Sequence, residues 1–349
     1  MTSLRAPQAI FIDPPYADYY GDKLFDISDT RLNRDDSLLP YHDLRSKLAT
    51  RGISVRTADF LFRGEGLAET NDYYSLGLLE DYQRLSGRRD VRLRGFLVFE
   101  PPVLVPKLYR KLPMLTTAFE KVFVHNVDGD GYSMRGVERS RLRKLFWPQS
   151  RDDVIPARWE NQHRLPRVVA ICGNHMPRSR RGELYSRRIE AMAALARLGV
   201  VDLYGRGWNQ WWSRRSMWPP YWFNYRTLMS IYRGPCASKH EVLSRYEFSL
   251  CLENMAMKGY VTEKLFDCLY AGAIPLYLGA QDIADLVPGD AFVDCRQFAS
   301  WKELWRFAEA LSASRRQAMR EAGRAFLRSN QGLKYFNSLL DIFSHTDDA

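Results

Sequence analysis

One segment in the second half of the chain concentrates polar side chains of the types that bind phosphate. An apolar run over residues 246–252 is followed by the polar residues Glu253, Asn254, Thr262, Glu263 and Lys264. The pattern predicts a strand, a loop and a helix capped by Thr262, at the edge of an α/β sheet where ligands bind. Lys264 opposes the positive end of the helix dipole unless an anion lies between them. The segment therefore predicts a diphosphate site, with a capped surface helix as the alternative.

A second polar set precedes this segment. The apolar run over residues 167–172 is followed by Gly173 and Asn174, and the helix predicted over residues 182–198 contains Arg187 and Arg188. A guanidinium group binds phosphate through two parallel hydrogen bonds, so an arginine of this basic run, which comprises Arg178, Arg180, Arg181, Arg187 and Arg188, suits a phosphate-bearing ligand. An exposed basic helix face explains most of the other arginines nearby. The residues alone do not separate Arg187 from Arg188.

Together these motifs resemble the signature of glycosyltransferase family 10, the α-1,3/1,4-fucosyltransferase family, in its bacterial form. The residues that carry the resemblance are Tyr246, Phe248, Glu253, Asn254, Tyr260, Val261, Thr262, Glu263, Lys264 and Gly279. The resemblance implies binding of GDP-fucose, with Lys264 on the diphosphate and Glu263 near the fucose or the ribose. It implies a donor site that also includes Asn174, Arg187 or Arg188, Glu253, Asn254, Tyr260 and Thr262. Gly173 stands where the family has Ser, which is a minor departure.

A carboxylate in the first half of the chain is the candidate general base. Glu100 follows an apolar run and precedes two prolines, where the family has Glu-Ser-Pro. By this resemblance Glu100 takes the proton from the acceptor hydroxyl, a role that suits a carboxyl group whose pKa is raised by partial burial. Position alone favours a simpler role, in which Glu100 hydrogen-bonds the turn that follows it.

The triplet Asp128-Gly129-Asp130 could bind a metal ion, but a glycine-rich turn capped by aspartates is the preferred interpretation. We assign no metal-ligating residue and expect no tightly bound cofactor. GDP-fucose is expected as the donor substrate, and stimulation by Mn²⁺ or Mg²⁺ stays open.

These inferences combine into an inverting glycosyltransferase that moves L-fucose from GDP-fucose to a hydroxyl of an acceptor glycan. Glu100, Glu263 and Lys264 are the predicted catalytic residues. The resemblance implies an α-1,3 linkage on a cell-surface, lipopolysaccharide-type or lipid-linked glycan. Two alternatives stay open: a transferase that uses another GDP-sugar, and a non-catalytic protein that binds a nucleotide or a glycan.

The elements that must position these residues alternate between strand and helix patterns along both halves of the chain. The expected fold class is α/β of the GT-B type, with two Rossmann-like βα domains facing across a cleft. The predicted parts are an N-terminal acceptor-binding domain (1–150), a linker (151–166), a C-terminal GDP-sugar-binding domain (167–330) and a C-terminal helical tail (331–349). Within the first domain, residues 73–85 are predicted as a helix.

Composition restricts the partners. The formal net charge of +10 suits acidic partners, but no nucleic-acid-binding module is recognisable. The five cysteines form no CxxC pair, which predicts buried, reduced thiols. The first residues show neither a signal peptide nor a membrane-spanning run, so a cytoplasmic location is expected, with peripheral contact at the inner face of the cytoplasmic membrane as a further expectation.

An aromatic-rich insert over residues 206–232 includes Trp208, Trp218, Tyr221 and Trp222 among several arginines. It predicts either a loop that grips carbohydrate or lies at a membrane interface, or ordinary packing within the domain.

Overall fold

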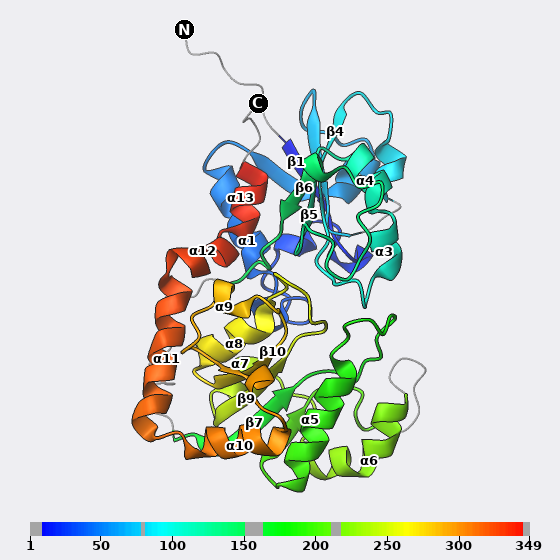
Figure 1. Cartoon of the computed structure of the whole chain (residues 1–349). Coiled ribbons are helices and arrows are strands. Elements are labelled where there is room, and N and C mark those ends of the chain that lie inside the picture. The colour runs from blue at the N-terminus through cyan, green and yellow to red at the C-terminus, as the bar shows by residue number, and fades with distance from the viewer. Residues whose placement is uncertain (1–8, 78–80, 151–162, 211–217, 345–349) are drawn as a thin grey trace. The chain divides into compact units, whose positions relative to one another are not determined.

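The computed structural model describes residues 9–77, 81–150, 163–210 and 218–344, and the chain divides into two compact units (Figure 1). Unit 1 comprises residues 1–151 and 335–349, and unit 2 comprises residues 152–334. Each unit is built on a parallel sheet with helices packed on it, which confirms the predicted α/β fold class. Most of the predicted linker, residues 151–162, lies outside the described residues.

Among the described residues, unit 1 has a six-stranded parallel sheet in the order β2-β1-β3-β4-β5-β6. Its strands are β1 Ala9–Asp13, β2 Ser54–Thr57, β3 Asn71–Ser75, β4 Val91–Leu97, β5 Lys121–Val124 and β6 Leu142–Lys144. The chain passes from β1 to β2 on one side and then to β3 on the other. The topological switch point of this sheet, where open α/β sheets bind ligands, therefore lies between β1 and β3.

The helices of unit 1 cover both faces of its sheet. They are α1 Leu39–Ala49, α2 Ala58–Phe62, α3 Pro106–Arg110, α4 Leu112–Ala118 and, from the C-terminus, α13 Ser338–Ser344. The ring of Phe343 in α13 lies 4.3 Å from that of Tyr74 in β3, and Leu339 is buried in the same cluster. The tail thus does not form a separate part: α12 Asn330–Phe336 leaves unit 2, and α13 completes the core of unit 1.

The predicted helix over residues 73–85 is wrong. Residues 71–75 form β3, at the middle of the sheet, and Asp81–Leu85 form a short 3₁₀ helix. All five residues of β3 are buried although Asn71, Asp72 and Ser75 are polar, so the strand shows neither the alternation of a half-exposed strand nor the apolar run of a typical buried parallel strand. For so short a run, periodicity cannot distinguish a buried strand from a helix.

Unit 2 has, among the described residues, a five-stranded parallel sheet in the order β11-β10-β9-β7-β8. Its strands are β7 Leu165–Ile171, β8 Val201–Tyr204, β9 Tyr246–Leu252, β10 Ile274–Leu278 and β11 Val293–Asp294. Its longer helices are α5 Tyr185–Arg197, α6 Pro219–Ile231, α8 Glu263–Ala271, α10 Trp301–Ala310 and α11 Ala313–Arg328. Helix α5 packs with α6 and α10, while α8 packs with α11 and with α7, Lys239–Leu243, so helices cover both faces of the sheet (Figure 1).

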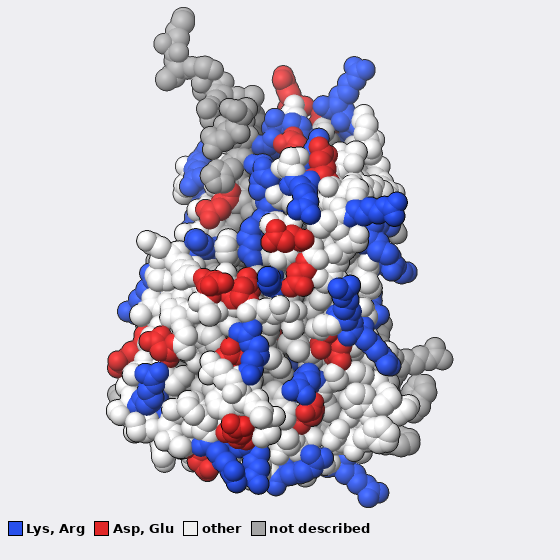
Figure 2. All heavy atoms as spheres, viewed as in Figure 1, with Lys and Arg blue, Asp and Glu red and all other residues white. Residues whose placement is uncertain are grey.

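Three features of the structure can be compared with the expectations drawn from the composition. None of the five cysteines is bonded to another, and four of them are buried, as predicted for reduced thiols. On the face shown in Figure 2, Lys and Arg are scattered among Asp and Glu without forming one continuous stripe. Within the described ranges, no helix combines the length and the apolar character needed to span a bilayer.

Candidate active site

The polar segment identified from the sequence lies at the switch point of unit 2. The chain passes from β7 to β8 on one side and then to β9 on the other, so β7 and β9 are neighbours whose carboxyl ends meet at one edge. Asn174 follows β7, and Glu253 and Asn254 follow β9. The candidate residues that the sequence placed on separate motifs are therefore brought to the edge where this type of sheet binds ligands.

Glu253 is fully buried and connects the end of β9 to the start of α8. Its Oε1 accepts a hydrogen bond from the Thr262 backbone N–H at 2.8 Å, and its Oε2 accepts one from the Thr262 hydroxyl at 2.7 Å. The Lys264 Nζ lies 3.3 Å from the same Oε2. Thr262 caps α8, as predicted, by accepting from the Lys264 N–H at 3.5 Å.

The anion that sequence reasoning required between Lys264 and the helix dipole is thus present in the protein itself. The Glu253 carboxylate lies at the N-terminus of α8, where the dipole favours a negative charge. Lys264 also lies 3.0 Å from the Thr262 hydroxyl and 3.5 Å from a Glu263 oxygen, and its side chain keeps 24% of its surface exposed. Lys264 can therefore meet a ligand at the surface while its position is set from within.

The balance of burial and nearby charge shifts the pKa values of the two glutamates in opposite directions. Burial raises the pKa of Glu253, and the positive charge of Lys264 offsets part of this rise. Burial also acts to raise the pKa of Glu263, but the charges of Lys264 and Lys239 outweigh it, so that the pKa of Glu263 is lowered. Glu263 is accordingly the more firmly ionised of the pair.

The structure separates the two adjacent arginines of α5. Arg188 is 5% exposed, and its Nη2 donates to the backbone oxygens of Leu252 at 2.7 Å and Glu253 at 3.0 Å. The same nitrogen lies 3.3 Å from the Asn254 Oδ1. Arg187 is exposed and pairs with Glu190, one turn further along the helix, at 2.7 Å. Only Arg188 of these two lies at the end of β9.

The remaining candidates complete this edge. The Asn254 Nδ2 donates to the hydroxyl of the buried Tyr260 at 3.4 Å, so Asn254 joins Arg188 to the loop before α8. Asn174 is 4% exposed, and its Nδ2 donates to the Gly207 oxygen at 3.2 Å. Gly279, at the end of β10, must lack a side chain, because a Cβ there would come within 2.5 Å of Glu253.

Gly173, which departs from the family pattern, has a physical explanation. A Cβ built at this position would lie 2.5 Å from the Nε2 of His175, so the imidazole fills the space beside Gly173. Burial and the charge of Arg188 lower the pKa of His175, which keeps the ring neutral at physiological pH. A serine at position 173 would have to displace this ring.

In unit 1, Glu100 follows β4 at the carboxyl edge of its sheet. The preceding backbone is held by His125, whose Nε2 lies 2.8 Å from the Phe99 oxygen and whose ring stacks on Trp147 at 5.8 Å. Burial lowers the pKa of His125 to about 4, so the ring is neutral and donates Nε2–H to the carbonyl. Glu100 also lies close enough to the buried Tyr109 for its charge to contribute to the raised pKa of that hydroxyl, after burial and Tyr132.

The aspartate triplet forms a turn, as the sequence favours, although the capping side chain is not one of its aspartates. The Asn126 Oδ1 accepts from the backbone N–H groups of Asp128 at 3.0 Å and Asp130 at 2.9 Å. Over the described part of the chain, no cluster of three or more His, Cys, Asp or Glu side chains has the arrangement of a metal site.

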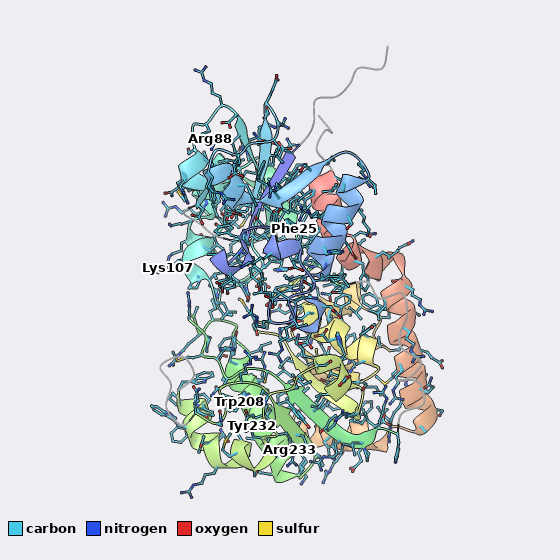
Figure 3. The ribbon with its side chains drawn as sticks, turned by 180° about the vertical axis from the view of Figure 1, so that it is seen from behind. Phe25, Arg88, Lys107, Trp208, Tyr232 and Arg233 are labelled. Carbon is cyan, nitrogen blue, oxygen red and sulfur yellow. The ribbon has the colours of Figure 1, made fainter. Side chains whose placement is uncertain are left out.

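The aromatic insert divides into buried and exposed parts. Trp208, Trp218 and Tyr221 are buried, and the Trp208 Nε1 donates to the Cys172 oxygen at the end of β7 at 2.7 Å. In Figure 3, Trp208 lies near Tyr232 and Arg233, all three from the part of unit 2 around β8. Trp222 of α6 is half exposed, and residues 211–217 of the insert lie outside the described residues.

Sequence reasoning passed over Asp13, which ends β1 at the switch point of unit 1 and is fully buried. The signal was available, because a carboxylate directly after an apolar strand is the same pattern that singled out Glu253.

Comparisons with known proteins agree with this geometry. Residues 167–320 match the model of the family described as glycosyltransferase family 10 (fucosyltransferase), C-terminal part. An α-(1,4)-fucosyltransferase of Arabidopsis thaliana is 42% identical over 72 residues, and an α-(1,3)-fucosyltransferase of Helicobacter pylori is 39% identical over 66 residues. These alignments span 21% and 19% of this chain but only 18% and 14% of the two relatives.

Solved structures resemble the chain over its whole length. A crystal structure of an α1,3-fucosyltransferase covers 100% of this chain with 93% of its own, at a TM-score of 0.54 and 16% identity. A structure of α1,3-fucosyltransferase with GDP-fucose covers 100% of the chain with 94% of its own, at a TM-score of 0.50 and 15% identity. At these identities the likeness concerns the fold.

Proposed function

Through residues 167–320 the chain belongs to glycosyltransferase family 10, and we propose that it transfers L-fucose from GDP-fucose to a hydroxyl of an acceptor glycan. The observation that carries the proposal is the meeting of Arg188, Glu253 and Lys264 at the switch point of unit 2. Two cations beside a helix N-terminus suit a diphosphate, because each phosphate oxygen can accept charge-assisted hydrogen bonds.

We assign the leaving GDP to Arg188 and Lys264. As the bond between fucose and the diphosphate breaks, negative charge develops on the leaving phosphate oxygen. Arg188 is held in place by two backbone carbonyls, and Lys264 by Glu253 and Thr262, so neither has to be reoriented when that charge appears. Glu263, the ionised carboxylate of the first turn of α8, is assigned to a hydroxyl of the fucose or the ribose.

Glu100 is proposed as the general base of an inverting reaction. It would accept the proton of the acceptor hydroxyl while that oxygen attacks the anomeric carbon on the side opposite GDP. The neutral His125 is a positioning residue for this step, since it holds the carbonyl of Phe99 directly before Glu100.

The acceptor is proposed only as a class, a glycan, and the linkage is proposed from resemblance alone. Two relatives of similar identity are an α-(1,4)- and an α-(1,3)-fucosyltransferase, so the shared segment does not specify the linkage, and the α-1,3 linkage on a cell-surface or lipopolysaccharide-type glycan rests on resemblance. Another GDP-sugar as donor is the second candidate, because nothing in the sequence motif is specific to the methyl group of fucose. The same proposal includes stimulation of the transfer reaction by Mn²⁺ or Mg²⁺, with neither ion required.

Donor binding is tested by thermal unfolding in the presence of GDP-fucose, GDP-mannose, UDP-sugars or oligonucleotides. We expect the largest upward shift with GDP-fucose, and we expect Lys264→Ala to remove that shift and the transfer activity together. Lys302→Ala, which changes an exposed lysine of α10, is the matched control and should keep both. A Lys264→Ala variant with unchanged turnover would contradict the donor site, and a preference for UDP-sugars or oligonucleotides would contradict the proposed donor.

A peripheral contact with the inner face of the cytoplasmic membrane is proposed from the surface of α6. Trp222 is 50% and Phe223 87% exposed on this helix, which contains Arg226 and no acidic residue. Apolar rings beside a positive charge suit the interface of an anionic bilayer. Sedimentation with vesicles containing anionic lipid should be lost on replacing Trp222 and Phe223 with Ala, and unchanged binding would contradict this contact.

A further inference from the structure

The connection between β1 and α1 in unit 1 has no role in the proposed reaction. It runs from Pro14 to Leu38 and contains three short 3₁₀ helices, Ala17–Tyr19, Lys23–Phe25 and Arg34–Asp36, so it is far longer than the roughly 2–6 residues usual for a connection from a strand to a helix. The connection leaves the sheet at the carboxyl end of β1, beside β3. This is the switch point of unit 1, the edge at which open α/β sheets bind ligands.

A buried carboxylate fixes the beginning of this loop. Asp13 is fully buried, and its Oδ1 accepts a hydrogen bond from the Tyr20 hydroxyl at 2.7 Å while its Oδ2 accepts one from the Tyr73 hydroxyl of β3 at 2.6 Å. Two residues after Tyr20, Asp22 has a left-handed φ of 63°. Its backbone N–H donates to the Thr57 hydroxyl, and its Oδ1 accepts from the Thr57 N–H, both at 2.9 Å.

Between Asp13 and the buried part of the loop, one aromatic ring faces the solvent beside a second that is partly buried. Tyr16 is 66% exposed, and its ring centre lies 6.4 Å from that of the partly buried Tyr19, with the two ring planes inclined at 43°. Leu24 and Phe25, by contrast, are buried in the core of unit 1 (Figure 3, where Phe25 is labelled). Because the loop is anchored on both sides of the tyrosines, little conformational freedom remains to be lost when a ligand binds them.

The charges at this edge indicate which ligand the tyrosines would receive. Asp18 is exposed between them, and an oxygen of Asp81 lies 3.4 Å from the Tyr20 hydroxyl. Glu100 follows β4, which lies two strands from β1, a separation of about 10 Å at ordinary sheet spacing. Arg84 lies 3.8 Å from Asp81 and offsets part of this negative charge. The remaining carboxylates disfavour phosphates and anionic lipids, and they accept hydrogen bonds from the hydroxyls of a neutral sugar.

We propose that Tyr16 and Tyr19 form a platform on which a neutral sugar ring of the acceptor glycan packs, at the same sheet edge as Glu100. The flat rings offer apolar surface to the C–H face of the sugar, and their hydroxyls and the nearby carboxylates meet its hydroxyl groups. Asp13 is a positioning residue that holds this loop through Tyr20. The assignment to an acceptor rests on the proposed transfer reaction, but the capacity to bind a sugar does not.

The test is binding of the full chain, without donor, to an array of neutral and sialylated oligosaccharides, followed by titration of the best ligand. We expect a neutral glycan to bind and Tyr16→Ala to weaken it roughly three- to tenfold, the range of one aromatic contact. Tyr16→Phe should keep the affinity, since the ring face is retained. The control Leu67→Ala, at another exposed apolar residue of unit 1, should have no effect.

The thermal shift with GDP-fucose separates this proposal from the previous one. It should be the same in Tyr16→Ala and in the unchanged protein, and where transfer is measurable, the KM for the acceptor should rise while the KM for the donor stays. Failure of the array to bind any neutral glycan, a preference for sialylated glycans, or equal affinity of Tyr16→Ala would overturn the platform. Glycan binding without fucose transfer would support the platform and contradict the reaction.

Discussion

Units 1 and 2 each carry a buried carboxylate at the switch point of a parallel sheet, but its surroundings differ. In unit 2, Glu253 lies 3.3 Å from the ammonium group of Lys264, and Arg188 binds the carbonyl of Glu253 itself. In unit 1, Asp13 accepts hydrogen bonds from the neutral hydroxyls of Tyr20 and Tyr73. The buried carboxylate thus has a lysine ammonium group as its direct partner at one edge and tyrosine hydroxyls at the other.

If both proposals hold, this difference explains how one architecture can bind two kinds of ligand. Parallel βα units place strand ends and helix N-termini at one edge whatever the sequence, so the edge itself does not specify a ligand. In unit 2 the neighbouring helices contribute Arg188 and Lys264, which suits a diphosphate. In unit 1 the long β1–α1 loop contributes tyrosines, and Glu100 lies at the same edge, which suits the neutral acceptor sugar that we propose.

Replacing Glu100, the proposed base, should have the largest effect. Glu100→Gln keeps the size of the side chain but cannot accept the proton, so we expect kcat to fall by roughly 10²–10⁴, the usual contribution of general base catalysis. The thermal shift with GDP-fucose should stay unchanged, since this residue belongs to the other unit. Glu65→Gln, at an exposed glutamate of unit 1, serves as control, and near-normal turnover in Glu100→Gln would remove it as the base.

The adjacent arginines of α5 provide the next test. Arg188→Ala should lower kcat by roughly 10²–10³, as for loss of one donor that stabilises developing negative charge. Arg187→Ala should change kcat less than twofold, because it breaks an exposed ion pair with Glu190, a type of contact that contributes little. Because Arg188 also ties α5 to β9, unfolding midpoints must be compared as well. Equal kinetic effects of the two substitutions would contradict the assignment.

The buried carboxylate of unit 1 predicts a pH dependence of stability. Burial raises the pKa of Asp13 to about 7, although the hydrogen bonds from Tyr73 and Tyr20 act in the opposite direction. Between about pH 4 and 7 the native protein keeps a proton that the unfolded chain releases, so Asp13 makes the free energy of unfolding fall as the pH rises through this window. The Asp13→Asn variant has no titratable group at this position, so its free energy of unfolding lacks this contribution to the pH dependence.

The unfolding midpoint of Asp13→Asn, compared with that of the unchanged protein, should therefore become relatively higher as the pH increases from about 4 to 7. A difference that is constant over this range would show that Asp13 does not hold its proton in the folded state.

Chelation should have the smallest effect. Arg188 and Lys264 supply positive charge at the edge of unit 2, so EDTA is expected to change kcat by less than about twofold, and added Mn²⁺ or Mg²⁺ to stimulate modestly at most. Loss of activity in EDTA that returns with Mn²⁺ would indicate that a metal ion, not these side chains, carries the charge of the leaving group.

The strand, the cap and the helix of the unit 2 site could be predicted from the sequence because each depends on residues that lie close together in the chain. The run that forms β9, the cap at Thr262 and the helix after it follow from apolar spacing and from one capping residue, and the structure has each of them. The α/β class follows from the repetition of such segments. The central strand β3 was missed because three of its five buried residues are polar, so it shows neither an alternating nor a continuous apolar pattern.

What the tertiary structure decided was which of these side chains meet. Arg187 and Arg188 are chemically identical neighbours, but adjacent residues of a helix point about 100° apart, and only the packing of α5 on the sheet turns Arg188 toward β9. Asp13 and Tyr73 lie far apart in the sequence and meet because β1 and β3 pair. The sequence thus determined the strand-end carboxylates and the capped helix, whose causes lie within a few residues, whereas the partner of each carboxylate depended on contacts that only the folded sheet creates.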